Sequence, residues 1–281
     1  MTTIPTTYQV IFRQEWQERT MLVVDEGGYR SLYFDNQMTQ SRMALAQPLW
    51  LILPYTRHML ASLLFVPSPR NLFMIGLGGG SLAKFFLHHY PECRVDVVDS
   101  NPAMAGIARQ FFFLPIENRL TLHCADGKEF VADMAGRGPL YDLILVDAFD
   151  HDGMSPSVYT SRFFQQIHLL LSRNGVLVLN LNRGETESYP LILAQLMESF
   201  PGLISRLPVA GPSRNEILFC HHEECSTAHL TALLQQVAEW QDLQPDLDFA
   251  DFMRRVVPLK KSLGKQWLDR LYRYRERFSA P

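Results

Sequence analysis

Two aspartates stand three residues apart in the segment Val146-Asp147-Ala148-Phe149-Asp150, directly after an apolar run that we expect to be a strand. A carboxylate held beside an amine can accept its proton, and the neutral amine can then attack an electrophilic carbon. A second carboxylate can anchor a cationic amine through a charge-assisted hydrogen bond. We therefore take Asp147 as the candidate general base and Asp150 as the candidate amine-binding residue. The alternative is that both are ordinary polar loop residues.

A glycine-rich turn, Gly76-Leu77-Gly78-Gly79-Gly80, follows another apolar run and precedes an expected helix. Glycines in a strand-to-helix turn let the backbone approach a ligand closely, because no side chains intervene. Gly76, Gly78 and Gly80 are therefore candidate ligand-binding positions. The turn alone fits any nucleotide-binding protein of this general kind.

Two further acidic residues follow expected strands. Asp99 lies 21 residues beyond Gly78, where a carboxylate can accept hydrogen bonds from both ribose hydroxyls. Asp126 can accept the exocyclic amino group of adenine, and Gly127 leaves space for the ring. Ser81 replaces the third glycine of the dinucleotide motif G-x-G-x-x-G, which favours a single nucleoside of the S-adenosyl type over NAD. The alternative is that the aspartates cap helices and the glycines only form turns.

Strands alternating with helices must position these residues, and they predict an α/β, Rossmann-like doubly wound sheet. Because the candidate site favours an S-adenosyl nucleoside, we expect a sheet of the S-adenosylmethionine-dependent methyltransferase type. Such sheets bind ligands at the carboxyl ends of their strands, where the glycines and aspartates stand. The expected strands are 72–75, 95–98, 120–124, 143–146, 176–181 and 217–219, and the expected helices run from the glycine turn through 86 and over 103–112 and 161–171.

The chain ahead of this region predicts a small β-unit followed by a helix. Three short extended runs, 8–12, 21–24 and 31–34, precede a helix over 55–65, and Gly27-Gly28 predicts a hairpin turn between the last two runs. The expected domains are an N-terminal β-unit at 1–45, a Rossmann-like nucleoside-binding catalytic domain at 46–225 and a C-terminal helical extension at 226–281.

Composition limits the possible partners. The 281 residues are 47% hydrophobic, with 26 basic and 29 acidic side chains, so no basic excess points to a nucleic acid.

The sequence predicts neither a signal peptide nor a membrane span. The first residues lack a basic stretch followed by an apolar run, and the most apolar segment, 49–66, is interrupted by Pro54, Arg57 and His58. Four cysteines are too few for the disulfide scaffold that is typical of oxidising compartments. We therefore expect a cytoplasmic protein. The run 220–225 contains metal-ligand residue types without the usual zinc spacing, so we expect no metal.

These motifs resemble the spermidine synthase (polyamine aminopropyltransferase) family over about residues 8–185. The family's I-G-G-G-D-G-G loop is similar to residues 75–81, its acidic ribose ligand falls on Asp99 and its D-G adenine contact on Asp126-Gly127. Its D-x-x-D signature falls on Asp147 and Asp150, the proton acceptor and a polyamine-binding residue. Family members use decarboxylated S-adenosylmethionine and usually form homo-oligomers, so the resemblance implies that cofactor and a homodimer.

The polyamine half of the family pattern is largely absent. The loop aspartate is Gly79 here, and the Y-H-E stretch becomes Tyr55-Thr56-Arg57, which keeps Tyr55 as a candidate substrate-binding residue but reverses a charge. A family tyrosine in a T-Y-P-S-G stretch has no counterpart at residues 209–213. We expect a divergent member that transfers an aminopropyl (alkyl) group to a small-molecule amine other than the usual dicationic acceptor, or to one with a negative group that Arg57 could pair with. The alternatives are a methyltransferase using intact S-adenosylmethionine, since fold does not fix chemistry, and a nucleoside-binding protein that has lost catalysis.

Overall fold

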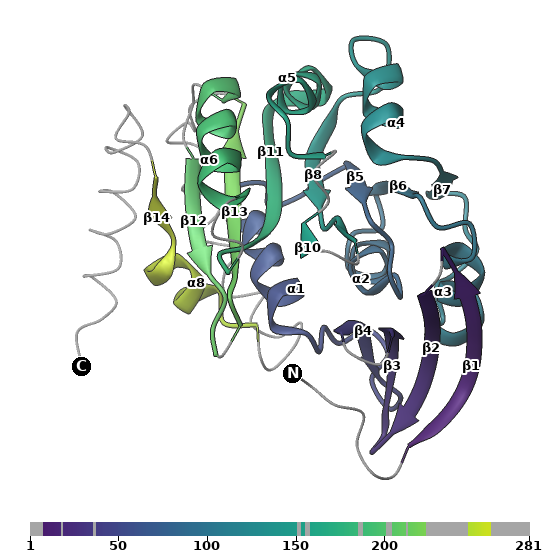
Figure 1. The fold of residues 1–281 in the computed structure, drawn as a ribbon. Coiled ribbons are helices and arrows are strands. Elements are labelled where there is room, and N and C mark those ends of the chain that lie inside the picture. The colour runs from purple at the N-terminus through teal and green to yellow at the C-terminus, as the bar shows by residue number, and fades with distance from the viewer. Residues whose placement is uncertain are drawn as a thin grey trace, which may run out of the picture.

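A small antiparallel sheet forms the N-terminal part of the protein in the computed structural model, which describes residues 8–17, 19–35, 38–150, 153–154, 158–184, 188–200, 204–211, 213–222 and 247–259. Its strands are β1 (Gln9–Trp16), β2 (Arg19–Glu26), β3 (Tyr29–Phe34) and β4 (Met38–Ala44), paired in that order (Figure 1). Gly27 and Gly28 form the β2–β3 turn with φ of 53° and 82°, as two-residue hairpins require. The sequence predicted three of these strands and missed β4, whose polar residues hide the strand pattern.

The large sheet is mixed. Its order is β14-β12-β13-β11-β8-β5-β6-β7, and the five strands from β11 to β7 are parallel. The predicted parallel, Rossmann-like arrangement is therefore confirmed, with three antiparallel strands added at one edge. The strands are β5 (Asn71–Ile75), β6 (Arg94–Asp99), β7 (Leu120–Cys124), β8 (Tyr141–Val146), β11 (Leu171–Asn182), β12 (Ile204–Pro208), β13 (Asn215–His221) and β14 (Val257–Pro258).

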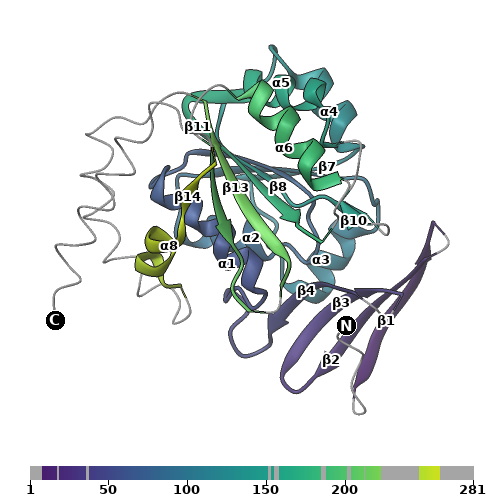
Figure 2. The same cartoon turned by 60° about the vertical axis from the view of Figure 1, so that its left-hand side comes forward.

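Helices cover both faces of this sheet (Figures 1 and 2). One face carries α1 (Pro54–Met59), the 3-10 helix η1 (Leu60–Leu64), α2 (Ser81–His89), α3 (Met104–Phe112) and α8 (Phe249–Arg255). The other carries α4 (Gly127–Met134), α5 (Ser161–Leu170) and α6 (Ser188–Ser199). The expected helix over 55–65 is thus split into α1 and η1. Of the expected C-terminal extension, only residues 247–259 lie within the part that the structure describes.

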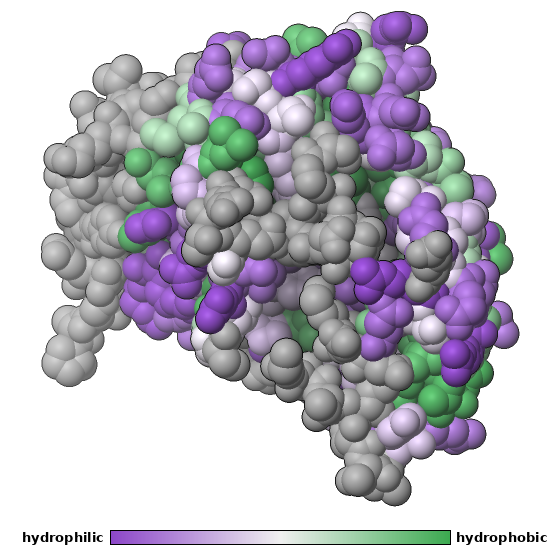
Figure 3. All heavy atoms as spheres, in the orientation of Figure 1, coloured by the Kyte–Doolittle hydropathy of each residue, from purple (hydrophilic) through white to green (hydrophobic). Residues whose placement is uncertain are grey.

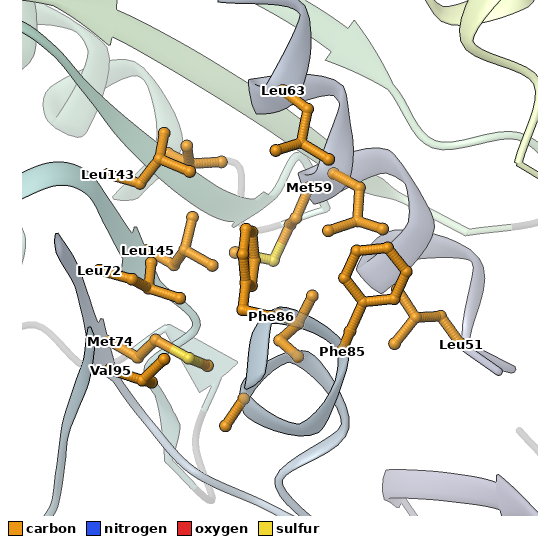
Figure 4. Close-up of a cluster of buried hydrophobic side chains, with 14 of the residues drawn as sticks. Leu51, Met59, Leu63, Leu72, Met74, Phe85, Phe86, Val95, Leu143 and Leu145 are labelled. Carbon is orange, nitrogen blue, oxygen red and sulfur yellow. The ribbon is translucent and has the colours of Figure 1, made fainter. Parts of the chain in front are cut away.

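The core follows the alternation of side chains along each strand. Leu72 and Met74 of β5 face the α2 side, whereas Phe73 and Ile75 face the α5 side. Figure 4 shows the first cluster, in which Phe85 and Phe86 of α2 lie among leucine and methionine side chains of β5, β8 and the α1–η1 segment. Burial on both faces explains why β5 and β8 are almost continuously apolar in sequence.

Lys84 of α2, the helix that follows the glycine turn, contacts both the N-terminal sheet and the end of α3. Its buried ammonium group donates to the carbonyl oxygens of Phe112 (2.7 Å) and Pro48 (3.0 Å) and lies 3.2 Å from the sulfur of Met43 in β4. Burial lowers the pKa of Lys84 to about 8. A buried lysine was not predicted, because nothing in a helical sequence pattern marks which lysine will be covered.

The outer surface carries several exposed hydrophobic side chains. Tyr8, just before the edge strand β1, and Val10, within it, are 47% and 43% exposed, and Figure 3 shows a hydrophobic patch in the region of β1 and β2. Within the described residues, every helix is too short or too polar to cross a bilayer. The homodimer implied by the family resemblance stays a prediction, and light scattering would test it.

Candidate active site

The glycine turn and Asp147 meet at the carboxyl ends of β5 and β8. The Asp147 N–H donates to the carbonyl oxygen of Ile75 at 3.0 Å. Gly76 has φ of 95°, and a Cβ atom there would lie 2.4 Å from the Asp147 carbonyl oxygen. Only glycine satisfies both the dihedral and the close approach. Two of the predicted site positions are therefore in direct contact.

The Asp147 carboxylate is half-buried and accepts two side-chain hydrogen bonds. The Asn180 side-chain amide, from β11, donates to Oδ1 at 2.8 Å. The Tyr55 hydroxyl, from α1, is the second donor. Burial raises the pKa of Asp147, while the two donors counteract that effect, and burial together with the nearby carboxylate raises the pKa of Tyr55 well above its usual value. A carboxylate whose pKa is raised binds a proton more tightly than an exposed one, and the two fixed donors hold it in one orientation.

Helix α1 holds Tyr55 in place. Pro54 begins the helix, a position where its missing N–H costs nothing. The buried His58 Nδ1 donates to the Pro54 carbonyl at 2.8 Å, so its Nε2 can accept from the Ala210 N–H at 3.2 Å. Arg57, considered from sequence as a partner for a negative group on the acceptor, instead donates to main-chain carbonyls of residues 51 and 52.

Asp99, at the end of β6, joins the glycine turn to the segment that follows β6. Its Oδ2 accepts from the Leu77 N–H and its Oδ1 from the Asn101 N–H, both at 2.9 Å, and burial raises its pKa. Each carboxylate oxygen has a second lone pair, so Asp99 can still accept ribose hydroxyls. The structure brings this residue against the glycine turn, as the sequence indicated. The ribose contact itself stays a prediction.

Asp126 and Gly127 lie at the start of α4. Asp126 is exposed and caps the helix, because its Oδ1 accepts from the Glu129 N–H at 3.0 Å. The helix-cap alternative weighed from sequence is therefore present, and the second carboxylate oxygen is left for a ligand. A Cβ atom at Gly127 would lie 2.8 Å from the Ile75 side chain, so close packing also requires glycine there.

The acceptor side of the site is built differently from the family pattern. Asp150 belongs to the two-residue strand β9 (Phe149–Asp150), paired with β10 (Gly153–Met154), and its side chain lies outside what the structure describes. A Cβ atom at Gly79 would lie 2.9 Å from the buried ring of Phe112. The place where the family carries its loop aspartate is therefore occupied by an aromatic ring.

Several site residues were missed from sequence. The Ser41 hydroxyl of β4 accepts from the Gly79 N–H at 2.7 Å, which ties the N-terminal sheet to the glycine turn. Asn180 lies within the predicted strand 176–181, where a buried polar residue among leucines and valines is a signal that could have been used. Asn215, whose amide donates to Asn180 Oδ1, and Ser213, whose hydroxyl donates to Asn215 Oδ1, carry no such signal.

Metal-ligand residue types do not gather in the described part of the chain: no group of three or more His, Cys, Asp or Glu side chains there is placed to hold an ion. Cys220 is buried within β13. Residues 223–225 and His229, the remainder of the cluster noted in the sequence, lie outside the described residues.

A glycine turn after β5 and carboxylates after β6 and β8, on this mixed sheet, define the α/β fold shared by S-adenosylmethionine-dependent methyltransferases and spermidine synthases. Residues 55–195 match the family model of the spermine/spermidine synthase domain. A polyamine aminopropyltransferase of Chromobacterium violaceum is 33% identical over 235 residues, which cover 83% of this chain and 88% of that protein. The chain belongs to the spermine/spermidine synthase family and is a transferase.

Solved structures give the same fold. The crystal structure of human methyltransferase-like protein 13 in complex with SAH is 31% identical, has a TM-score of 0.59 and covers 66% of this chain and 91% of its own. A spermidine synthase in complex with the transition state analogue AdoDATO is 16% identical, has a TM-score of 0.68 and covers 92% of this chain and 88% of its own. At 16% identity, the second comparison bears on the fold alone.

Proposed function

We propose that this protein transfers the aminopropyl group of decarboxylated S-adenosylmethionine to a small-molecule amine, with Asp147 as the general base. The sulfonium group of that compound carries the alkyl group that is transferred. The nucleoside would be held by the glycine turn, by Asp99 at its ribose and by Asp126 and Gly127 at its adenine. The donor set fits such a ligand, because Asp99 lies against the turn with acceptor capacity to spare.

The observation that supports this proposal most strongly is the setting of Asp147. Its carboxylate is half-buried beside the glycine turn and is oriented by Tyr55 and Asn180. Asp147 would take the proton of the acceptor amine as the amine attacks, and its raised pKa makes it a better base than an exposed aspartate. Asp150, which follows three residues later, would bind the acceptor's cationic group.

Methyl transfer from intact S-adenosylmethionine is the second candidate, and the lack of an acidic side chain at position 79 favours it. An acidic side chain at position 79 would repel the carboxylate of the intact cofactor's amino-acid tail, and here the phenylalanine ring fills that space. The similarity to human methyltransferase-like protein 13, with SAH in its structure, points the same way. The two candidates share Asp147 and differ in the group transferred.

Product analysis separates the candidates. The purified protein would be incubated with a panel of amines and either decarboxylated or intact S-adenosylmethionine, and the nucleoside products quantified by mass spectrometry. Release of methylthioadenosine with the decarboxylated compound, lost in Asp147→Asn, is the expected result. Formation of S-adenosylhomocysteine alone would replace the proposal with methyl transfer. An Asp147→Asn variant as active as the parent would remove Asp147 from the mechanism.

A further inference from the structure

Three polar side chains form a hydrogen-bonded chain that ends on Asp147. The Ser213 hydroxyl donates to Asn215 Oδ1 at 2.8 Å, and the Asn215 amide donates to Asn180 Oδ1 at 2.7 Å. The Asn180 amide then donates to Asp147 Oδ1 at 2.8 Å. The two asparagines belong to the paired strands β13 and β11, so a rigid sheet carries the middle of the chain.

The direction of this chain follows from the chemistry of its ends. An ionised carboxylate can only accept hydrogen bonds, so Asn180 must turn its NH₂ group toward Asp147 and its oxygen toward Asn215. Asn215 must then present its NH₂ group to Asn180 and its oxygen to the Ser213 hydroxyl. The Asn215 N–H donates back to Ser213 Oγ at 3.1 Å, which leaves the hydroxyl proton for the amide oxygen. Each of the three side-chain hydrogen bonds of the chain is therefore donated in the direction of Asp147.

We propose that Asn180, Asn215 and Ser213 are positioning residues, a directional relay that orients the Asp147 carboxylate and favours its ionised form. Asn180 is buried, so water cannot replace the hydrogen bonds that its amide would lose by turning over. Within the described residues, the groups that act on the pKa of Asp147 are Asn180 from β11 and Tyr55 from α1. The value of the relay for catalysis rests on the proposed function, but its effect on the Asp147 proton does not.

Asn215→Asp reverses the relay with little change in shape. The new carboxylate accepts hydrogen bonds only, so the Asn180 amide turns its NH₂ group toward residue 215 and its oxygen toward Asp147. An oxygen facing Asp147 favours the protonated acid, which can donate to it. The proton affinity of Asp147 then rises about tenfold or more, as expected when a hydrogen bond to a charged group is lost.

Asn182→Asp is the matched control. Asn182 is the direct cross-strand neighbour of Asn215, and its Oδ1 accepts from the Gly184 N–H at 2.9 Å, a bond that a carboxylate also makes. This variant adds the same negative charge in the same part of the sheet, while residue 215 keeps the amide group that donates to Asn180. It therefore measures the through-space effect of the charge, which the Asn215→Asp result must exceed.

The test is the titration of the Asp147 carboxyl carbon by ¹³C NMR in the free protein, assigned with Asp147→Asn. The expected result is a rise of about one in the pKa of Asp147 in Asn215→Asp beyond that in Asn182→Asp. The mild Ser213→Ala variant, which frees Asn215 to turn, gives a smaller rise and serves if Asn215→Asp does not fold. An unchanged pKa in Ser213→Ala, or equal rises in the two aspartate variants, would overturn the relay.

Activity separates this inference from the function. In an active enzyme, the acidic limb of the pH–rate profile moves to higher pH in Asn215→Asp and in Ser213→Ala, but not to the same extent in Asn182→Asp. A protein with the expected NMR shifts and no transferase activity would leave the relay intact and refute the proposed function. Normal transferase activity without the expected NMR shifts would refute the relay and leave the proposed function intact.

Discussion

Alanine at Gly76 would act on the candidate base through the backbone. The residue has φ of 95°, and the added Cβ atom would lie 2.4 Å from the carbonyl oxygen of Asp147. Ordinary van der Waals contact begins at 3.4 Å, so the two groups must separate by about 1 Å (3.4 minus 2.4). Because the obstacle is a main-chain atom of Asp147, no side-chain rotation can relieve the overlap.

Both stability and activity should respond. A left-handed conformation costs a non-glycine residue about 1–2 kcal/mol, and the overlap adds to that. At about 2–4 °C per kcal/mol for a domain of this size, we expect the melting temperature to fall by about 5 °C or more. A displacement of about 1 Å at a reacting group can lower the rate about 100-fold. Differential scanning fluorimetry and the product assay measure the two effects.

Gly106→Ala is the control for this prediction. Gly106 lies within α3 and has open space where a Cβ atom would be placed, so alanine should leave stability unchanged or raise it by up to about 1 kcal/mol. The reasoning fails if Gly76→Ala melts and reacts like the parent protein. It also fails if both alanine variants lose activity equally, because the effect would then not depend on contact with Asp147.

Three further predictions concern single side chains. Tyr55→Phe removes a donor that lowers the pKa of Asp147, so the acidic limb of the rate profile should move to higher pH, with an activity loss of about tenfold near that limb. Lys84 has a pKa of about 8 in the folded protein, against 10.5 in the unfolded chain, so the unfolded chain binds more protons between these two pH values. The free energy of unfolding should therefore rise with pH across this range, by at most about 3 kcal/mol. Chemical denaturation should show this rise in the parent protein and its absence in Lys84→Met. Gly79→Asp must displace the Phe112 ring, so it should lower the melting temperature relative to Gly106→Asp, and an equal melting temperature for the two variants would contradict the packing argument.

The sequence predicted the fold well where local patterns determine it. Apolar runs ending in glycine or aspartate gave β5 to β8 and their order along the chain, because strands buried on both faces must be continuously hydrophobic. It predicted less well where tertiary contacts decide the structure. The polar strand β4 and the antiparallel strand β12 are stabilised by their neighbours in the sheets, and α6 was not predicted at all.

In the candidate site too, some positions follow from local sequence patterns and others only from the folded structure. The positions next to strand ends, Gly76, Asp99 and Asp147, meet because parallel strands end at one edge of the sheet. Asn180 and Ser41 were not assigned, because each lies within a strand and not at the strand end where the pattern marks a site, and their contacts with Asp147 and Gly79 appear only on folding. Only the folded structure shows that an asparagine in β11 faces the aspartate after β8.

Calorimetric titration of the purified protein with decarboxylated and with intact S-adenosylmethionine, under matched conditions, tests the central claim most directly. We predict binding of the decarboxylated compound with clear preference, reduced at least tenfold in Asp99→Asn because the ribose hydroxyls lose a charged acceptor. A preference for the intact compound would contradict aminopropyl transfer. Failure to bind either compound would contradict the nucleoside site itself.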